Sequence, residues 1–226
     1  HHPFAENTLK AIKEIKQTDP SFEMYVMLGA WIQCKDAFTE KPINHEEDYE
    51  GNKFEITEAV RLAQEYPDIV KIIAVGNEAM VHWAWSYHVP PKFVLKWVKH
   101  LQDLKLNGVL NNDLWITSSD NFASWGGGSP EYHNEDLNEL IRSVDFVSMH
   151  TYAYHNSHYY PEFWNNPESE HSLTDFEKVN SAMKRALEFA KMQYKNVSDY
   201  VKSIDSTKTI HIGETGWSSF SNELYG

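Results

Sequence analysis

Short apolar runs alternate along this chain with longer stretches in which apolar residues recur every three or four positions. The short runs predict β-strands over residues 23–29, 72–75, 114–118, 144–149 and 209–212. The longer stretches predict helices that start at Asn7 or Thr8 and stop before Pro20, run over 54–66, run from Pro90-Pro91 to Gly108, and run over 135–143 and 175–203. Because helices and strands alternate, we expect an α/β fold in which helices pack on a parallel sheet.

The apolar stripes of two helices predict which side chains enter the core. The helix after Pro90-Pro91 carries Val94, Trp97, Val98, Leu101 and Leu104 on one face. The last helix is expected to turn inward Phe176, Val179, Met183, Leu187, Ala190 and Tyr194. Trp115, which lies within a predicted strand, is also expected to be in the core.

Polar or aromatic residues follow the C-terminal ends of the predicted strands. They are Trp31, Asn77 and Glu78, Asp120 and Asn121, His150 and Tyr152, and Glu214 and Trp217. Clustering of such residues along one whole edge of a parallel sheet is typical of a TIM (β/α)8 barrel. A doubly wound sheet would place them mainly at one switch point, so the barrel is favoured.

Two of these strand-end residues, Glu78 and Glu214, are carboxylates that follow a short apolar run and a glycine. A charge at the end of a buried strand is costly to desolvate, and binding or catalytic groups are often found there. An ordinary strand terminus whose glutamate meets solvent or a lysine is the plainer alternative for Glu78 alone. Two such carboxylates together predict a two-carboxylate mechanism.

Composition narrows the possible ligands. The net charge is −13 and no Lys/Arg cluster with interleaved aromatic residues occurs, which argues against nucleic acid and polyanionic substrates. No apolar run approaches 18 residues, so no membrane span is expected. Cys34 is the only cysteine, and the 12 histidines form no His-Glu-x-x-His pattern, so we expect neither a disulfide, nor a metal, nor another cofactor.

The chain opens on His1-His2-Pro3 without an initiator methionine, which indicates a processed or trimmed piece. The sequon Asn196-Val197-Ser198 fits a secreted origin. We therefore expect a secreted, periplasmic or cell-surface protein, acting as a monomer.

Three ordered segments, Val75-Gly76-Asn77-Glu78, Phe146 to Tyr152 and Gly213 to Trp217, resemble glycoside hydrolase family 17, the β-1,3-glucanase family of (β/α)8 enzymes. Met27-Leu28-Gly29-Ala30-Trp31 resembles the third strand of that family. The resemblance implies that Glu78 is the general acid/base and Glu214 the nucleophile, at the ends of the fourth and seventh strands. The five predicted strands match the third to seventh. Residues 1–226 would then form a single, partial catalytic domain with an incomplete barrel.

The resemblance also implies a retaining mechanism on a neutral β-glucan, expected to be β-1,3-linked as in laminarin. In such a site the negative charge of Glu214 favours the protonated form of Glu78, which donates to the leaving oxygen. Expected substrate-binding residues are Asn77, Tyr152, Trp31, Trp217, Asn121, His150 and Trp125. The tryptophans offer flat rings for pyranose faces, and Trp83 and Trp85 are further candidates to wall the cleft.

Plainer alternatives stand beside these assignments. Asn77 and Asn121 can be turn-forming residues, Tyr152 a packed and hydrogen-bonded side chain, and His150 a structural donor. The same two carboxylates also serve transglycosylation, in which a sugar hydroxyl replaces water. A glucan-binding fragment without turnover is the alternative outside enzyme chemistry.

Overall fold

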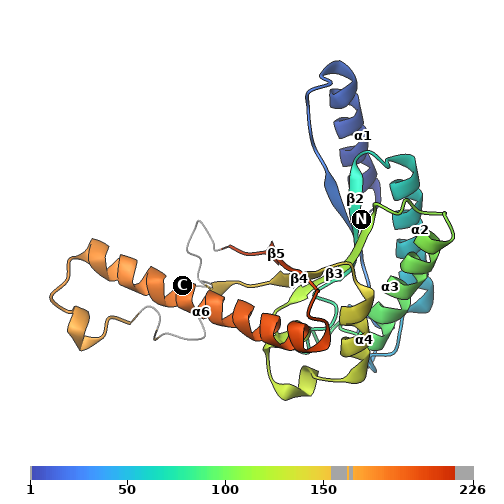
Figure 1. Cartoon of the computed structure of the whole chain (residues 1–226). Helices are drawn as coiled ribbons and strands as arrows, with labels where there is room; N and C mark the ends of the chain where they lie inside the picture. The colour runs from blue at the N-terminus through green and yellow to red at the C-terminus, as the bar shows by residue number, and fades with distance from the viewer. Residues whose placement is uncertain (1, 154–161, 163–164, 217–226) are drawn as a thin grey trace.

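The computed structural model describes residues 2–153, 162 and 165–216, which form an α/β structure around a parallel sheet (Figure 1). The five strands are β1 (Val26–Ala30), β2 (Val70–Asn77), β3 (Trp115–Asn121), β4 (Val147–His150) and β5 (Ile210–Glu214). They pair in the order β1-β2-β3-β4-β5, and every neighbouring pair is parallel. Sequential parallel neighbours joined by helices are the arrangement of part of a TIM barrel, as predicted. The eight strands of a closed barrel are not present among the described residues.

Helices precede and connect the strands. They are α1 (His2–Thr18), α2 (Tyr49–Glu65), α3 (Pro91–Leu106), α4 (Glu135–Ser143) and α6 (Asp175–Ile204), with short helical turns η1 (Ala123–Gly127), η2 (Pro130–Tyr132) and η4 (Glu168–Glu170). In Figure 1, α2, α3 and α4 lie together on one side of the sheet, while α6 runs past β4 and β5 and its N-terminal part projects beyond them. No helix among the described residues is long and apolar enough to cross a membrane.

The core lies between the sheet and α2, α3 and α4. Ile73 and Val75 of β2, Ile116 of β3 and Val147 of β4 are completely buried, as is Leu101 of α3. The stripe predicted for α3 is confirmed for all five of its positions, four of them buried and Leu104 partly buried against the core. Burial of an apolar side chain of this size contributes roughly 1.5–3 kcal/mol.

Capping groups explain where the helices begin. α4 has the predicted bounds because Oδ1 of Asn134 accepts a 2.9 Å hydrogen bond from the Leu137 amide. α2 begins earlier than predicted, since Asp48 accepts from the Gly51 amide and adds a turn. The predicted start of α1 is wrong: Thr8 lies inside the helix, where its hydroxyl donates to the Phe4 carbonyl.

Two predictions of buried aromatic and apolar residues are wrong. On α6, Phe176 is 75% exposed, and Val179, Met183, Leu187 and Tyr194 are exposed as well. The buried residues of this helix are Ala182, Ala186, Gln193, Val197 and Val201. The predicted stripe is uncovered because β5 is the last strand of the described sheet and no described element packs beyond it. Trp115, at the first position of β3, is 48% exposed rather than buried.

Candidate active site

Glu78 leaves the sheet through a sharp turn at the end of β2. Gly76 has φ 80°, and a Cβ there would lie 2.8 Å from the Cβ of Ala79, so glycine is required. Glu78 itself has φ 45°, a conformation that costs a non-glycine residue roughly 1–2 kcal/mol. Its amide donates a 2.9 Å hydrogen bond to the Ser119 carbonyl, which holds the turn against β3. Backbone strain of this kind is concentrated at functional sites.

Glu214 ends β5 directly opposite His150 of β4 in the sheet register. The preceding residue, Gly213, packs against the hydroxyl of Ser148, and a Cβ at that position would overlap this oxygen. The glycine before the glutamate is therefore explained by close packing between β4 and β5. The Thr151 amide donates a 3.0 Å hydrogen bond to the Glu214 carbonyl and extends the strand pairing past the sheet edge.

A single histidine nitrogen contacts both carboxylates. Nδ1 of the buried His150 lies 3.3 Å from Oε1 of Glu78 and 3.4 Å from Oε2 of Glu214. The structure thus brings together two strand-end glutamates that are far apart in the sequence. Nε2 of the same ring lies 2.7 Å from Oγ of Ser119, which in turn lies 2.9 Å from Oγ of Ser148.

The neighbouring groups favour one tautomer of His150. Nδ1 faces carboxylate oxygens, which accept but do not donate when ionised, so Nδ1 carries a proton. In the neutral ring Nε2 is then an acceptor, and the Ser119 hydroxyl donates to it. Ser148 completes the chain by donating to Ser119. The histidine therefore presents an N–H toward the space between Glu78 and Glu214.

Tyr152 holds the second carboxylate. Its hydroxyl donates a 2.7 Å hydrogen bond to Oε2 of Glu214. Burial, the hydrogen bond to Glu214 and the charges of Glu214 and Glu78 raise the pKa of Tyr152 to about 12. The phenol therefore keeps its proton at neutral pH and donates to the carboxylate.

Asp120 is a completely buried carboxyl group beside these residues. Its two oxygens accept hydrogen bonds of 2.8 Å each from the amides of Met80 and Asn121. Burial raises the pKa of Asp120 to about 7 against the opposing effect of these two amides, and the charge of Glu78 adds to the rise. Asp120 thereby ties the segment that follows Glu78 to the end of β3.

The other predicted polar residues divide between the surface and the turns. Asn77 is exposed at the end of β2, where it pairs in register with Ser119. Asn121 is buried, and its Oδ1 accepts a 3.1 Å hydrogen bond from the Ala123 amide, which is the turn-forming role. His150, being buried, contacts the carboxylates rather than the surface.

The predicted tryptophans also lie in different environments. Trp31 is half-buried beside the site, with its Nε1 donating to Oε1 of Gln33 at 2.9 Å. Trp125 is completely buried, and its Nε1 donates to the Ser148 carbonyl at 2.9 Å, so this ring supports β4 from within the core. Trp83 and Trp85 are exposed. Trp217 lies outside the described residues.

Sequence reasoning missed four residues of this region. Ser119 and Ser148 orient His150, and Phe38 and Tyr87 form ring contacts with Trp31. The serines lie in β3 and β4 with no distinctive pattern around them. The position of Phe38 in a long polar loop was the one available signal for an exposed aromatic residue.

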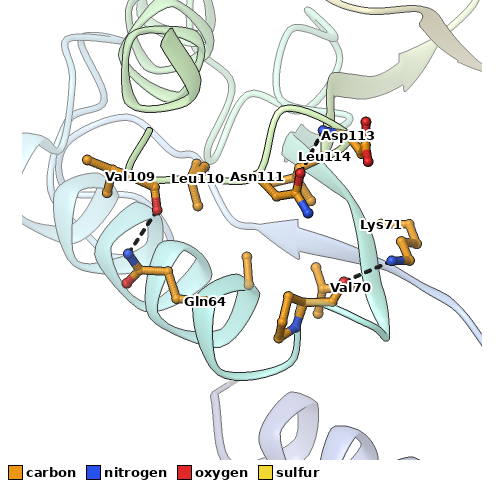
Figure 2. Close-up of a pocket in the computed structure, with 10 residues that line it drawn as sticks. Gln64, Val70, Lys71, Val109, Leu110, Asn111, Asp113 and Leu114 are labelled. Carbon is orange, nitrogen blue, oxygen red and sulfur yellow. Dashed lines mark hydrogen bonds between the residues drawn. The ribbon is translucent and has the colours of Figure 1, made fainter. Parts of the chain in front are cut away.

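A cavity of about 210 Å³ lies away from the carboxylates, between the end of α2, the start of β2 and residues 109–114 (Figure 2). Two of its polar side chains bond to neighbouring backbone: Nε2 of Gln64 donates to the Val109 carbonyl, and Nζ of Lys71 donates to the Pro67 carbonyl. The candidate site is therefore the edge that carries Glu78 and Glu214. Within the described part of the chain, no group of three or more His, Cys, Asp or Glu side chains is arranged to hold a metal ion.

Comparison with known proteins shows that the chain is similar to a polysaccharide hydrolase. The chain is 58% identical to the crystal structure of an endo-laminarinase from Formosa Hel1_33_131, with a TM-score of 0.95 over 98% of this chain. It spans 56% of that laminarinase chain, about half its length. No protein-family model and no curated protein matches the sequence.

Two weaker similarities were also found. One is to AbfB, a family 51 α-L-arabinofuranosidase from Bifidobacterium longum, at 17% identity and a TM-score of 0.41, over 76% of this chain and 32% of that one. The other is to a psychrophilic family 10 endo-β-1,4-xylanase, at 14% identity and a TM-score of 0.32, over 75% and 57%. Both scores are too low to carry an argument.

Proposed function

We propose that this chain carries the catalytic pair of a retaining β-1,3-glucan hydrolase, with Glu214 as nucleophile and Glu78 as general acid/base. The observation that carries the proposal is the contact of both carboxylates with Nδ1 of His150. Carboxyl groups of retaining sites lie about 5–5.5 Å apart, whereas those of inverting sites lie about 6.5–9.5 Å apart. Because Glu78 and Glu214 both contact the same nitrogen of His150, their carboxyl groups are close together, which supports the spacing of a retaining site.

The substrate class follows from similarity and charge. Laminarin is the substrate named for the 58% identical neighbour, which supports a β-1,3-glucan for this chain and an endo mode of attack. A net charge of −13 disfavours sulfated or uronate polymers. The motifs around Glu78 and Glu214 support membership of glycoside hydrolase family 17. Secretion and a monomeric state are predictions that go with this assignment.

In the first step an oxygen of Glu214 attacks the anomeric carbon while Glu78 gives its proton to the departing glycosidic oxygen. Tyr152 and His150 both contact Oε2 of Glu214, and we assign the attack to Oε1. In the second step Glu78 removes a proton from water, the water oxygen bonds to the anomeric carbon, and the Glu214 carboxylate is released. We assign to Asn77, which is exposed at the sheet edge, the contact with the sugar 2-hydroxyl.

The test is hydrolysis of laminari-oligosaccharides by the complete protein, with product stereochemistry followed by NMR. We expect β-configured products from the wild type and no turnover by Glu214→Ala. Added azide should restore turnover in that variant and give an α-glycosyl azide, because azide attacks from the face that the nucleophile vacated. A fully active Glu214→Ala variant would refute the assignment.

The same products separate the alternatives. Oligosaccharides longer than the substrate would indicate transglycosylation, and retention on immobilised laminarin without any cleavage would indicate a binding protein. Shorter products alone support hydrolysis.

A further inference from the structure

Three aromatic rings form a cluster in the loops that follow β1 and β2. Phe38 and Tyr87 stack with centroids 5.3 Å apart and an interplanar angle of 29°. Trp31 lies 5.2 Å from Tyr87 and 6.3 Å from Phe38, tilted against both. Trp31 and Tyr87 are half-buried, whereas Phe38 is 63% exposed. We refer to Trp31, Phe38 and Tyr87 as the aromatic platform.

Backbone hydrogen bonds fix the platform in place. The Cys34 amide donates to the Tyr87 carbonyl at 2.9 Å, and the Phe38 amide donates to the Ser86 carbonyl at 3.2 Å, so two backbone hydrogen bonds join the two loops. Phe38 has φ 58°, which costs a residue with a Cβ roughly 1–2 kcal/mol. The fold therefore spends conformational energy to present an apolar ring to solvent.

The platform adjoins the catalytic candidates. Trp31 directly follows β1, whose last residue, Ala30, pairs in register with Val75 of β2. Tyr87 belongs to the loop that starts at Ala79, next to Glu78, and is closed by the hydrogen bond from the Val89 amide to the Ala79 carbonyl. Burial, followed by the charges of Glu78 and Asp120, raises the pKa of Tyr87, which is a further sign of proximity.

We propose that the aromatic platform is a glucan-binding subsite remote from the scissile bond, in which Phe38 stacks on the face of a glucose ring. This inference rests on the proposed function and adds a specificity-determining residue to it. An exposed ring in the loops that follow β1 and β2 suits a pyranose, because the sugar offers axial C–H bonds to the ring face and keeps its hydroxyl rim in water. Phe38 has no polar atom on its side chain, so it contributes contact with the ring face alone. Tyr87 and Trp31 support it from beneath.

The test compares Phe38→Ala with wild type on laminari-oligosaccharides of increasing length, and measures laminarin affinity separately by electrophoresis in a laminarin-containing gel. We expect KM for long chains to rise about tenfold and gel retardation to weaken, with a smaller effect on the shortest cleaved substrate. Phe38→Tyr keeps the ring and should recover both values. The matched control is Tyr25→Ala, which removes a 54% exposed aromatic side chain just before the start of β1, at the opposite end of that strand.

The outcomes are distinct. Wild-type values for Phe38→Ala on every substrate, or a loss equal for short and long chains, would overturn the subsite. An equal loss in Tyr25→Ala would also overturn it, since removal of any exposed aromatic would then have the same effect. If the wild-type protein itself neither cleaves nor binds laminarin, the proposed function fails, whatever the variant does.

Discussion

Oγ of Ser119 lies 2.7 Å from Nε2 of His150, so a hydroxyl on β3 holds the ring of a β4 histidine from the side opposite the two carboxylates. The opposite nitrogen, Nδ1, contacts both Glu78 and Glu214. The relative position of the two carboxylates thus depends on a hydroxyl that contacts neither of them. In many metal-binding and catalytic histidines, a hydrogen bond at one ring nitrogen likewise orients the other nitrogen toward the functional group.

Ser119→Ala tests this dependence. The substitution leaves Nε2 of a buried imidazole without its donor, and we expect unfolding to become about 1–3 kcal/mol easier. Because the ring of His150 would lose the hydrogen bond that holds it in place, kcat should fall about tenfold or more, with a smaller change in KM. Urea unfolding and steady-state kinetics provide the two measurements.

The neighbouring serine is a matched control. Oγ of Ser118 is buried and has no hydrogen-bond partner among the residues that the structure describes. Ser118→Ala should therefore be neutral or slightly stabilising and leave kcat unchanged. Equal losses in both variants would mean that the substitutions disturb β3 itself rather than the hydrogen bond to His150.

The strand-end glutamates and His150 were predictable from sequence, whereas the serines that orient this histidine were not. Glu78 and Glu214 each end a β-rich run, and in a parallel sheet such ends meet at one edge. The pairing of Ser119 with His150 depends on the register between β3 and β4, which no local pattern encodes. For Trp125, the role expected from the sequence was wrong. It was expected to bind substrate, but its indole is completely buried and bonds to β4.

The apolar pattern of α6 predicted burial wrongly, because no described element covers that face of the helix. The apolar stripe of α6 predicted burial, but among the residues that the structure describes the sheet ends at β5, and Phe176 and its neighbours are exposed. Periodicity states which face of a helix is apolar, and only the tertiary arrangement determines whether that face is covered.

Tyr152→Phe removes the hydroxyl that donates to Oε2 of Glu214. Since the bond is made to the proposed nucleophile, kcat should fall about 10²–10³-fold while the fold is retained. With the pKa of Tyr152 at about 12, this phenol contributes no titration to the activity profile below about pH 10. Tyr194→Phe, which removes a surface hydroxyl 3.4 Å from the Ile210 carbonyl, should keep wild-type rates. Comparable losses in the two variants would contradict the role of Tyr152.

Asp120 gives the stability of the protein a defined pH dependence. Its pKa is about 7 in the folded state and close to 3.8 in the unfolded chain, so folding favours the protonated carboxyl. The resulting stabilisation is fully present below about pH 4 and is lost as the pH rises through about 7. We expect this part of the free energy of unfolding to fall by a few kcal/mol over that range.

Asp120→Asn isolates this contribution. Asparagine has one acceptor oxygen for the two amides of Met80 and Asn121, so the variant should be less stable at pH 5. The deficit should shrink by pH 8, where the wild type holds a buried charge and the variant does not. Thermal unfolding of both proteins at the two pH values measures the difference. A deficit that grows with pH would show that Asp120 is stabilised as the anion.

Gly213→Ala tests the close packing behind Glu214. The added methyl group would overlap Oγ of Ser148 and lie 3.0 Å from Oγ of Ser119, so β5 must shift away from β4. We expect a loss of about 1–3 kcal/mol in unfolding free energy and a large fall in kcat, because Glu214 moves with the strand. In the double variant Gly213→Ala/Ser148→Ala the overlapping oxygen is gone, and the nearest Ser148 atom is Cβ at 3.5 Å. Together with the wild type and Ser148→Ala alone, these variants complete a double-mutant cycle. Recovery of stability in the double variant beyond the sum of the single effects confirms the overlap as the cause, and strict additivity contradicts it.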